Sequence, residues 1–258
     1  MSSKVKLSIL IPVRNEGLNI EIMLKMLRAM VEVPYEVLIV YDFPNDKSIP
    51  VVKRLRPKYS DVRLIYNNLG RGVVNAIKAG VHTSKGEYIL IFAVDEVGPV
   101  LAIDDMIALM DKGCDMVSCT RYAHGGRRLG GSLIGSILSK MGNKLFHIIS
   151  GFAFTDSTTG IKMFRKSIFD KIKLEAKPIG WAVVFEFAIK AQAAGFKLGE
   201  VPIVSIDRLY GGESTFSLWP WFKEYFKWFL WGARQLSSKR IRQKIMIRVP
   251  HTINSEKR

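Results

Sequence analysis

The sequence predicts an α/β fold, with a mostly parallel central sheet that has helices on both faces. Apolar runs rich in β-forming residues alternate with segments whose apolar residues recur at helical spacing, and this alternation fills the first hundred residues. The clearest run is Tyr88–Glu96, YILIFAVDE, which lies between Gly86 and Gly98-Pro99. A run of this length and apolarity, bounded by turn residues, is typical of a buried strand in the middle of a parallel sheet.

The first half of the chain supplies the elements of this pattern in regular alternation. Each expected strand is a continuous apolar run that ends in polar or turn residues, and each expected helix follows such an end. We expect strands at Val5–Val13, Tyr35–Asp42, Val62–Asn67 and Tyr88–Asp95. We expect helices at Leu18–Met30, near Pro50–Leu55, and from the glycine turn at 70–72 to about His82.

The second half continues the pattern less regularly. We expect helices at Leu101–Lys112, Ser132–Ser150 and Val183–Ala194, and strands at Asp115–Tyr122, Gly160–Arg165 and Lys197–Asp207. Glycines and arginines in 125–131 predict a flexible basic segment. The aromatic density rises abruptly near Trp219, so we divide the chain into a domain at 1–218 and an appendage at 219–258.

Composition limits the classes of protein that the chain can be. Its 258 residues, 48% of them hydrophobic, suffice for one large domain with a proper core. The two cysteines and four histidines show no metal-ligand or disulfide spacing, which suits a reducing compartment. The N-terminus lacks the layout of a signal peptide, and no run reaches the ~18 apolar residues of a membrane span. The net charge of +16 favours polyanionic partners such as phosphorylated substrates, anionic lipid or nucleic acid.

Polar side chains follow several of the expected strands. Asn15-Glu16, Asp42 and Asp95-Glu96 come at strand ends, which in a parallel sheet meet at one edge, where such sheets bind ligands. Two adjacent acids can hold a hard divalent cation that bridges phosphates, and the nearby Gly70-Arg71-Gly72 turn fits a nucleotide. The plainer alternative is that the acids are solvated and that the glycines only give the loop backbone freedom.

Taken in order, the motifs of the chain resemble those of the family 2 glycosyltransferases, which have the Rossmann-like GT-A fold. The early motifs are PVRNE at 12–16, Asp42 with Asp46, and Gly70-Arg71-Gly72. The later ones resemble dolichyl- or polyprenyl-phosphate mannosyltransferases more specifically. There CTRYAHGG at 119–126 is similar to SRYxxGG, DSTTGIKMFR at 156–165 to DxTxGFRxxR, and the segment 199–214 to EVPxxxxxR…GxS. The resemblance extends over residues 5 to 218.

This resemblance implies a nucleotide-diphosphate sugar donor, a divalent metal (Mg²⁺ or Mn²⁺), an inverting transfer and a polyprenyl phosphate acceptor. By matched position, the metal would be bound by Asp95, with Glu96 beside it, and Arg121 and Asp156 would lie near the transferred sugar and the acceptor. The residues implied to contact the donor are Pro12, Asn15, Glu16, Asp42, Gly70, Arg71, Asp95, Arg208 and Ser214.

The chain departs from the family pattern at two positions. Ala93 stands where the first acid of the DxD motif is usual, and Glu96 would replace it only if the chain bends after Asp95, since a regular strand would direct Glu96 to the opposite face. Thr215 stands where many relatives have a phosphate-binding lysine, so Arg208 or Lys197 would have to compensate. These departures keep open a weakly active or non-catalytic relative that acts as a membrane-bound subunit.

The acceptor decides whether a base is needed. A lipid phosphate is already anionic near neutral pH and can attack the anomeric carbon unaided, so positioning and stabilisation of the departing diphosphate would suffice. A saccharide hydroxyl, the alternative acceptor, requires a carboxylate base. Asp156 is then the first candidate and Glu186 the second, although Asp156 also fits a turn cap and Glu186 a buried partner for a basic side chain.

The segment Trp219–Trp231, WPWFKEYFKWFLW, predicts an amphipathic interfacial helix followed by a basic tail. The alternative is that its aromatic stripe packs on the domain as core. With Ser132–Ser150, a second apolar helix, it favours a peripheral protein on the cytoplasmic face of a membrane, holding a polyprenyl chain. We do not expect nucleic acid as a partner, because its binding motifs are absent and acid-lined strand ends would repel phosphates.

Overall fold

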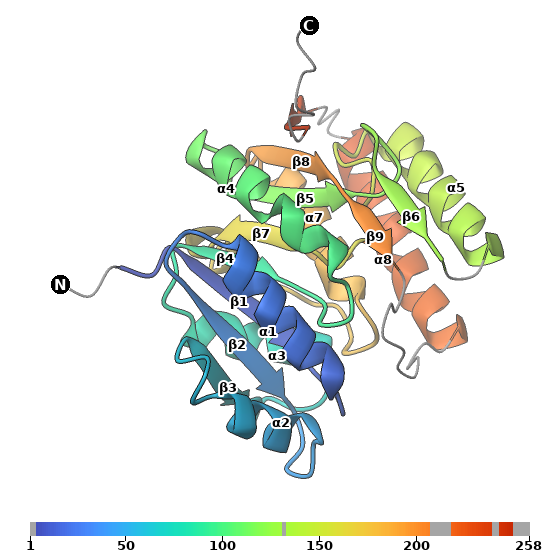
Figure 1. Ribbon diagram of the computed structural model, residues 1–258. Coiled ribbons are helices and arrows are strands. Elements are labelled where there is room, and N and C mark those ends of the chain that lie inside the picture. Colours follow the sequence, from blue (N-terminus) through green and yellow to red (C-terminus); the bar gives the residue numbers. More distant parts are fainter. Residues whose placement is uncertain (1–3, 131–132, 207–217, 239–242, 250–258) are drawn as a thin grey trace, which may run out of the picture.

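A computed structural model describes residues 4–130, 133–206, 218–238 and 243–249. Its centre is an eight-stranded sheet in the order β10-β8-β5-β7-β4-β1-β2-β3, in which β7 alone runs antiparallel to its neighbours (Figure 1). The strands of this sheet are β1 Leu7–Pro12, β2 Tyr35–Tyr41, β3 Val62–Tyr66, β4 Tyr88–Ile91, β5 Met116–Thr120, β7 Lys162–Arg165, β8 Leu198–Pro202 and β10 Met246–Ile247. The predicted mostly parallel α/β architecture is confirmed.

Helices cover both faces of the sheet because each face carries its own apolar core. One core joins the sheet to α1 (Leu18–Met30), α2 (Ser48–Leu55), the 3-10 helix η1 (Gly98–Ala102) and α4 (Ile103–Asp111). The other core joins it to the second set of helices, which includes the short α6. That set is α3 Val73–Thr83, α5 Leu133–Ser150, α6 Lys166–Phe169, α7 Ala182–Ala193 and α8 Leu218–Ser238.

The expected strand Tyr88–Glu96 is too long. β4 ends at Ile91, and the chain then forms a turn in which the Glu96 amide donates to the Ala93 carbonyl oxygen at 3.3 Å. Phe92 and Val94 remain buried, although they lie beyond the strand. Apolarity therefore continues past the end of the strand, which is why the sequence pattern did not mark the turn.

The expected strand Lys197–Asp207 is divided into two. β8 ends at Pro202, and β9 (Val204–Ile206) leaves the main sheet to pair in parallel with β6 (Arg127–Leu129). The segment 125–131, expected to be flexible, therefore contains a strand over 127–129. The backbone of β9 passes so close to η1 that a Cβ at Gly98 would lie 2.1 Å from the Val204 carbonyl oxygen.

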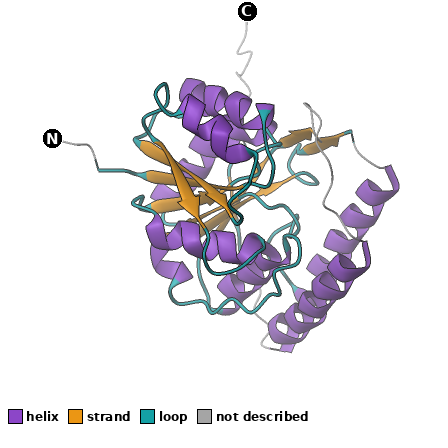
Figure 2. Ribbon diagram, turned by 90° about the horizontal axis from the view of Figure 1, so that it is seen from below, coloured by secondary structure: helices purple, strands orange, loops and turns teal. Residues whose placement is uncertain are grey.

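Helices α5 and α8 lie side by side at one margin of the molecule (Figure 2). The rings of Phe146 on α5 and Phe229 on α8 join them, with centroids 5.0 Å apart. α8 packs inward through Trp228 and Leu236, which are buried, so part of its aromatic stripe is core. In the described part of the chain no helix is both long and apolar enough to cross a membrane.

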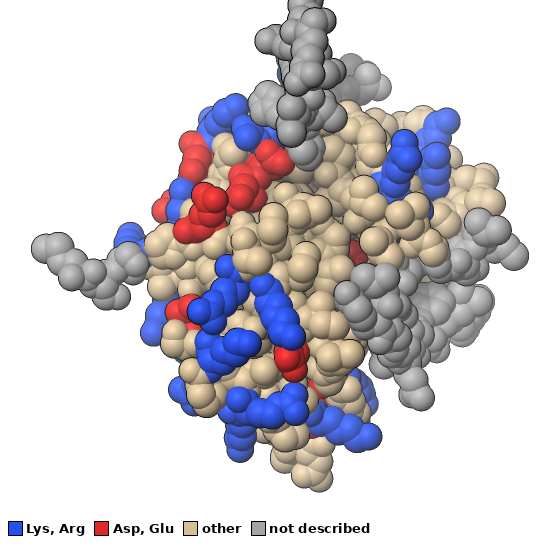
Figure 3. All heavy atoms as spheres, viewed as in Figure 1, with Lys and Arg blue, Asp and Glu red and all other residues tan. Residues whose placement is uncertain are grey.

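The excess positive charge is unevenly distributed. Figure 3 shows basic side chains gathered over α1 and α2, and acidic side chains gathered near α4. The exposed basic residues of α1, α2 and the turn after α2 include Lys25, Arg28, Lys53, Arg54 and Lys58. They lie on the sheet face opposite the core that α5 and α8 share. These basic side chains therefore do not contribute charge to the surface of α5 and α8.

Candidate active site

Most of the predicted site residues come together at one edge of the sheet. β1, β2, β4 and β5 all run in one direction, so the residues that follow them meet at their carboxyl ends. β7 is antiparallel and begins at this same edge, which brings the loop before it to the site. The residues placed here are Pro12, Asn15, Glu16, Asp42, Gly70, Arg71, Asp95, Glu96, Arg121 and Asp156. Arg208 and Ser214 lie outside the described residues.

The expectation that Lys197 replaces a missing phosphate-binding lysine is wrong. Lys197 immediately precedes β8, which runs parallel to β5, so this lysine lies at the amino edge of the sheet. Its backbone amide donates to the carboxylate of Asp115, just before β5, at 2.9 Å. The whole length of a strand separates it from the acids at the carboxyl edge.

A network of short bonds fixes the loop after β1 against the loop after β2. The Asn15 amide donates to Asp46 Oδ1 at 3.0 Å, and the Lys47 amide donates to Asn15 Oδ1 at 3.2 Å. Asn15 adopts a left-handed φ of 56°, which asparagine tolerates better than most residues. Asp46 is only 1% exposed and also accepts the Ser48 amide at 2.7 Å. The sequence motif included Asp46, but the sequence did not predict that Asp46 joins the two loops through these hydrogen bonds.

Asp42 connects the end of β2 to the glycine turn before α3. Its Oδ2 accepts a hydrogen bond from the Gly72 amide at 3.0 Å, whereas its Oδ1 is buried and has no hydrogen-bond partner among the described residues. Gly70 and Gly72 have φ values of 104° and 105°, a region that favours glycine. A buried carboxylate oxygen without a partner is costly, and a hydroxyl or N–H donor of a ligand would satisfy it.

Asp95 and Glu96 are half-buried neighbours in the turn after β4. Because they are not in a strand, the alternation of faces that would have separated them does not apply. Ser205 Oγ on β9 donates to Glu96 Oε2 at 3.4 Å, and no hydrogen bond or ion pair among the described residues occupies the Asp95 carboxylate.

The metal implied by the sequence would have few protein ligands. Within the described ranges no cluster of three or more His, Cys, Asp or Glu side chains could hold a metal ion. A pair of carboxylates still fits Mg²⁺ or Mn²⁺, because such an ion commonly binds one or two carboxylates and takes its other ligands from water and substrate phosphates. Asp95, with Glu96 adjacent, is the pair that the site offers.

Arg121 and Asp156 form a bidentate ion pair at the same edge. Arg121 Nε donates to Asp156 Oδ2 at 2.7 Å and Nη2 donates to Oδ1 at 3.0 Å, while the Arg121 amide also reaches Oδ2 at 3.2 Å. The Asp156 side chain is fully buried and that of Arg121 is 11% exposed. Burial alone would raise the pKa of Asp156, but the adjacent Arg121 guanidinium holds it below its usual range. Asp156 is therefore ionised, with its oxygens already engaged.

The other base candidate is engaged as well. Glu186 on α7 is buried, and its two oxygens accept the backbone amides of Glu175 and Ala176 at 2.6 and 2.7 Å. Lys190 lies 2.7 Å from it, one helical turn away. The alternative interpretation, a buried partner for a basic side chain, fits the contact with Lys190, and Glu186 also holds the 175–176 segment onto α7.

Two buried ionisable residues beside the pair were not predicted as part of the site. Lys162, at the start of β7, is fully buried, and its Nζ donates to Ser118 Oγ and to the Thr159 carbonyl oxygen, both at 3.0 Å. Burial lowers the pKa of Lys162 to about 8, against the opposing effect of Asp156. Glu200 on β8 accepts the Thr155 amide at 2.8 Å, and burial raises its pKa to about 7. For Lys162, the sequence did carry one signal of a buried charge, namely a lysine inside the short apolar strand GIKMFR.

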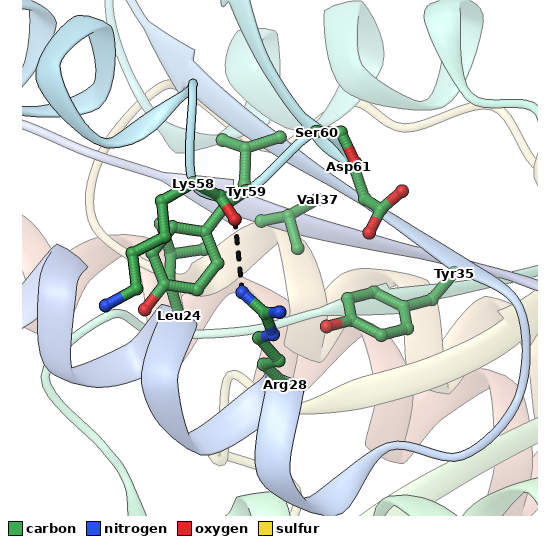
Figure 4. Close-up of a pocket in the computed structure, with 9 residues that line it drawn as sticks. Leu24, Arg28, Tyr35, Val37, Lys58, Tyr59, Ser60 and Asp61 are labelled. Atoms are coloured by element: carbon green, nitrogen blue, oxygen red, sulfur yellow. Dashed lines mark hydrogen bonds between the residues drawn. The ribbon is translucent and has the colours of Figure 1, made fainter.

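A small cavity lies at the opposite edge of the sheet (Figure 4). Its volume is about 150 Å³, and it is lined by Tyr35 and Val37 of β2 and by Arg28 of α1, whose Nη1 donates to the Lys58 carbonyl oxygen at 3.1 Å. Because these residues stand at the amino ends of β2 and β3, the cavity is remote from the acids at the carboxyl ends. It is also too small for a nucleotide-diphosphate sugar.

Comparison with known proteins identifies the family to which the chain belongs. The sequence pattern of the glycosyl transferase family 2 matches residues 8–173, more than half of the chain. The chain therefore belongs to family 2 of the glycosyltransferases. Among curated relatives, the dolichol-phosphate mannosyltransferase of Pyrococcus furiosus is 25% identical over 201 residues, which are 77% of this chain and 56% of the relative. The chain thus spans about half the length of that relative.

Solved structures confirm the fold. The glucosyl-3-phosphoglycerate synthase of Mycobacterium tuberculosis, in complex with Mn²⁺, UDP and phosphoglyceric acid, matches with a TM-score of 0.66 at 13% identity, over 89% of this chain and 78% of that one. The mannosyltransferase PcManGT of Pyrobaculum calidifontis, in complex with GDP-Man and Mn²⁺, matches with a TM-score of 0.59 at 15% identity, over 92% and 74%. At these identities the likeness establishes the GT-A architecture.

Proposed function

We propose that this glycosyltransferase moves a sugar from a nucleotide-diphosphate donor to a polyprenyl phosphate at the surface of a membrane, with inversion and with a divalent metal. The observation that carries the proposal is the construction of α5. Its polar residues Ser139 and Asn143 face the Arg121–Asp156 pair, and most of its large apolar residues are exposed, whereas Phe146 packs in the core. An acceptor with a phosphate head and an apolar tail matches these two environments.

The outer surface of α5 and α8 has the composition of a membrane-binding surface. Six large apolar residues of α5 and three of α8 are each about half exposed or more; they are Ile137, Leu138, Met141, Leu145, Ile148, Ile149, Phe222, Phe226 and Leu230. Exposed basic residues stand among them at Lys140, Lys144, Lys223, Lys227 and Arg234. The acid of these two helices, Glu224, is buried. Apolar residues with a purely basic rim are complementary to an anionic lipid surface.

The donor would lie along the edge from Asp42 to Asp95. Asp42 Oδ1, which has no hydrogen-bond partner in the described part of the chain, would accept from a ribose hydroxyl or a base N–H, and the Asn15 loop is bonded to Asp46 and Lys47. Asp95 would hold Mg²⁺ or Mn²⁺, with Glu96 adjacent. When bound, the metal supplies positive charge to the departing diphosphate. Arg208 and Ser214 are proposed to contact the same diphosphate.

The transfer itself needs little from the protein beyond positioning. An oxygen of the acceptor phosphate forms a bond to the anomeric carbon, the bond from that carbon to the donor diphosphate breaks, and the nucleoside diphosphate leaves. The phosphate oxygen is already anionic, so no proton is removed. Arg121 would orient the acceptor phosphate, and Asp156, whose oxygens are engaged by Arg121 and Thr158, would hold Arg121 in place rather than accept a proton.

The test is a transfer assay with UDP- and GDP-linked sugars, in Mn²⁺ or Mg²⁺, with polyprenyl phosphate in vesicles that contain anionic lipid. We expect product with one donor, none with the dephosphorylated prenol, and loss of product with Asp95→Ala. Transfer to a saccharide hydroxyl in preference to the lipid phosphate would favour the alternative acceptor. Donor binding and turnover that Asp95→Ala leaves unchanged would remove this acid from the reaction.

A further inference from the structure

The hydroxyl of Thr158 joins α5 to the Arg121–Asp156 pair. It accepts hydrogen bonds from Arg121 Nη2 and from Asn143 Nδ2, each at 3.1 Å, and lies 3.2 Å from Asp156 Oδ1, to which it donates. A threonine hydroxyl has one hydrogen to donate and two lone pairs to accept with, so all of its capacity is used here. Any displacement of Asn143 therefore disturbs both members of the ion pair.

Asn143 is itself fixed on all sides. It is 4% exposed, its Oδ1 accepts the Ser157 amide at 2.8 Å and the Ser157 hydroxyl, and its Nδ2 also donates to the Ser139 carbonyl oxygen at 2.9 Å. These bonds hold the backbone next to Asp156 directly onto α5. A buried amide with every group satisfied has one orientation, so it transmits the position of the helix to the loop.

Ser139, one turn earlier on α5, provides a second connection. Its Oγ lies 2.9 Å from the hydroxyl of Tyr122, which donates to it, and the Tyr122 ring lies beneath the Arg121 guanidinium, 5.1 Å from centroid to Cζ. Arg121 is thus supported from α5 both through Tyr122 and through Thr158. The outward side of the same two turns carries Leu138 and Met141, which are 64% and 63% exposed.

We propose that α5 couples contact with lipid to the geometry of the Arg121–Asp156 pair, and that Asn143 is the positioning residue of this coupling. The inference rests on the membrane surface proposed above. Lipid contact immobilises the outer face of α5, whose apolar side chains are exposed among the described residues, and the inner face transfers this order to residues 155–158. Because coupling is reciprocal, a phosphate held at Arg121 also strengthens the attachment of α5 to the membrane.

Hydrogen exchange on the full chain tests the coupling without requiring turnover. The amides of 155–158 are measured with and without vesicles of phosphatidylglycerol and phosphatidylcholine, with binding checked by flotation. We expect vesicles to slow exchange in this segment about fivefold or more in the unmodified protein. Asn143→Ala should still float with the vesicles, because its outer face is unchanged, but its exchange in 155–158 should not slow.

A matched control and a second variant make the result specific. Gln192 is also a buried amide, and it bonds the backbone of Gly151 and Ala153, so Gln192→Ala should keep the vesicle effect. If Asn143→Ala does not fold, Ser139→Ala, which removes the bond from Tyr122 and the 3.5 Å contact with the Thr158 hydroxyl, should weaken the vesicle effect. Two outcomes would overturn the coupling alone. In the first, the unmodified protein floats with vesicles but its amide exchange in 155–158 does not slow. In the second, vesicles slow this exchange in Asn143→Ala as much as in the unmodified protein. Unmodified protein that does not float overturns the membrane surface as well.

Discussion

Asp42 accepts a hydrogen bond from the backbone amide of Gly72 at 3.0 Å, although the two residues lie 30 positions apart in the chain. The acid at the end of β2 and the turn that opens α3 therefore form one unit. The other oxygen of the same carboxylate is buried without a partner among the described residues. This arrangement leaves a pre-positioned acceptor at the edge where we propose that the donor binds.

Replacing Asp42 by alanine should weaken nucleotide binding by about tenfold or more, because a hydrogen bond to a charged acceptor is lost. Calorimetry or thermal shift with UDP and GDP measures this, since a ligand that binds the folded state raises the melting temperature. Asp61→Asn, at an exposed acid beside the cavity on the other edge, is the control and should bind nucleotide normally. Equal affinities for the two variants would contradict the assignment of Asp42.

Gly72→Ala should destabilise the fold more than Gly113→Ala. Both glycines have left-handed φ values, 105° and 95°, so both variants meet backbone strain. A Cβ at Gly72 would also lie 2.6 Å from Cβ of Pro178, whereas nothing lies within 4 Å of a Cβ at Gly113. Urea unfolding of the two variants isolates the steric part of the effect. Equal losses of unfolding free energy would show that Pro178 moves away without cost.

The substitution Lys162→Met should stabilise the fold relative to the unmodified protein, and this stabilisation should decrease as pH rises. Burial lowers the pKa of Lys162 from 10.5 to about 8, so between these values the unfolded chain binds more protons than the folded one. Stability of the unmodified protein then increases with pH through this window, and the buried charge is most costly below about pH 8. The melting temperature of the unmodified protein, relative to Lys162→Met, should therefore rise from pH 7 to pH 10. A pH-independent difference would argue against a depressed pKa.

Leu138→Glu should abolish flotation with anionic vesicles and leave the melting temperature almost unchanged, because the side chain is 64% exposed. Leu18→Glu on α1 is the matched control, at 63% exposure on the other face of the sheet, and should float normally. Lys140→Ala with Lys144→Ala should weaken binding by about 1 kcal/mol per residue, and added salt should remove that difference. If Leu18→Glu were as damaging as Leu138→Glu, the membrane surface would be wrong.

The sequence predicted the parallel sheet and the edge at which the acids gather, because both depend on local patterns. Apolar runs that end in polar residues mark strand ends, and strands of one direction place those ends together. The end of β4 was not predicted, because Phe92 and Val94 are buried beyond the strand and prolong the apolar run. The division of 197–207 into β8 and β9 likewise has no local signal besides Pro202.

Contacts that depend on long-range packing could not be predicted from the sequence. Arg121 and Asp156 meet because β7 is antiparallel and inserted between β4 and β5, a topology that no periodicity encodes. The same limit applies to α5, whose pattern predicted a helix but not which side would face the protein. Lys162 and Glu200 were not predicted as part of the site, because a buried charge in a short strand can be recognised only when its neighbours are known.

The position of β7 also constrains how the chain can fold. β5 pairs with β7 and β8 and never with β4, so residues emerging before β7 can build only the four-stranded sheet β4-β1-β2-β3. During synthesis the backbone groups on both edges of β5 stay unpaired until later residues emerge, and residues 162–165 are needed to join β5 to that sheet. Open strand edges favour pairing with other chains, so nascent protein that stalls between β5 and β7 should be prone to aggregate.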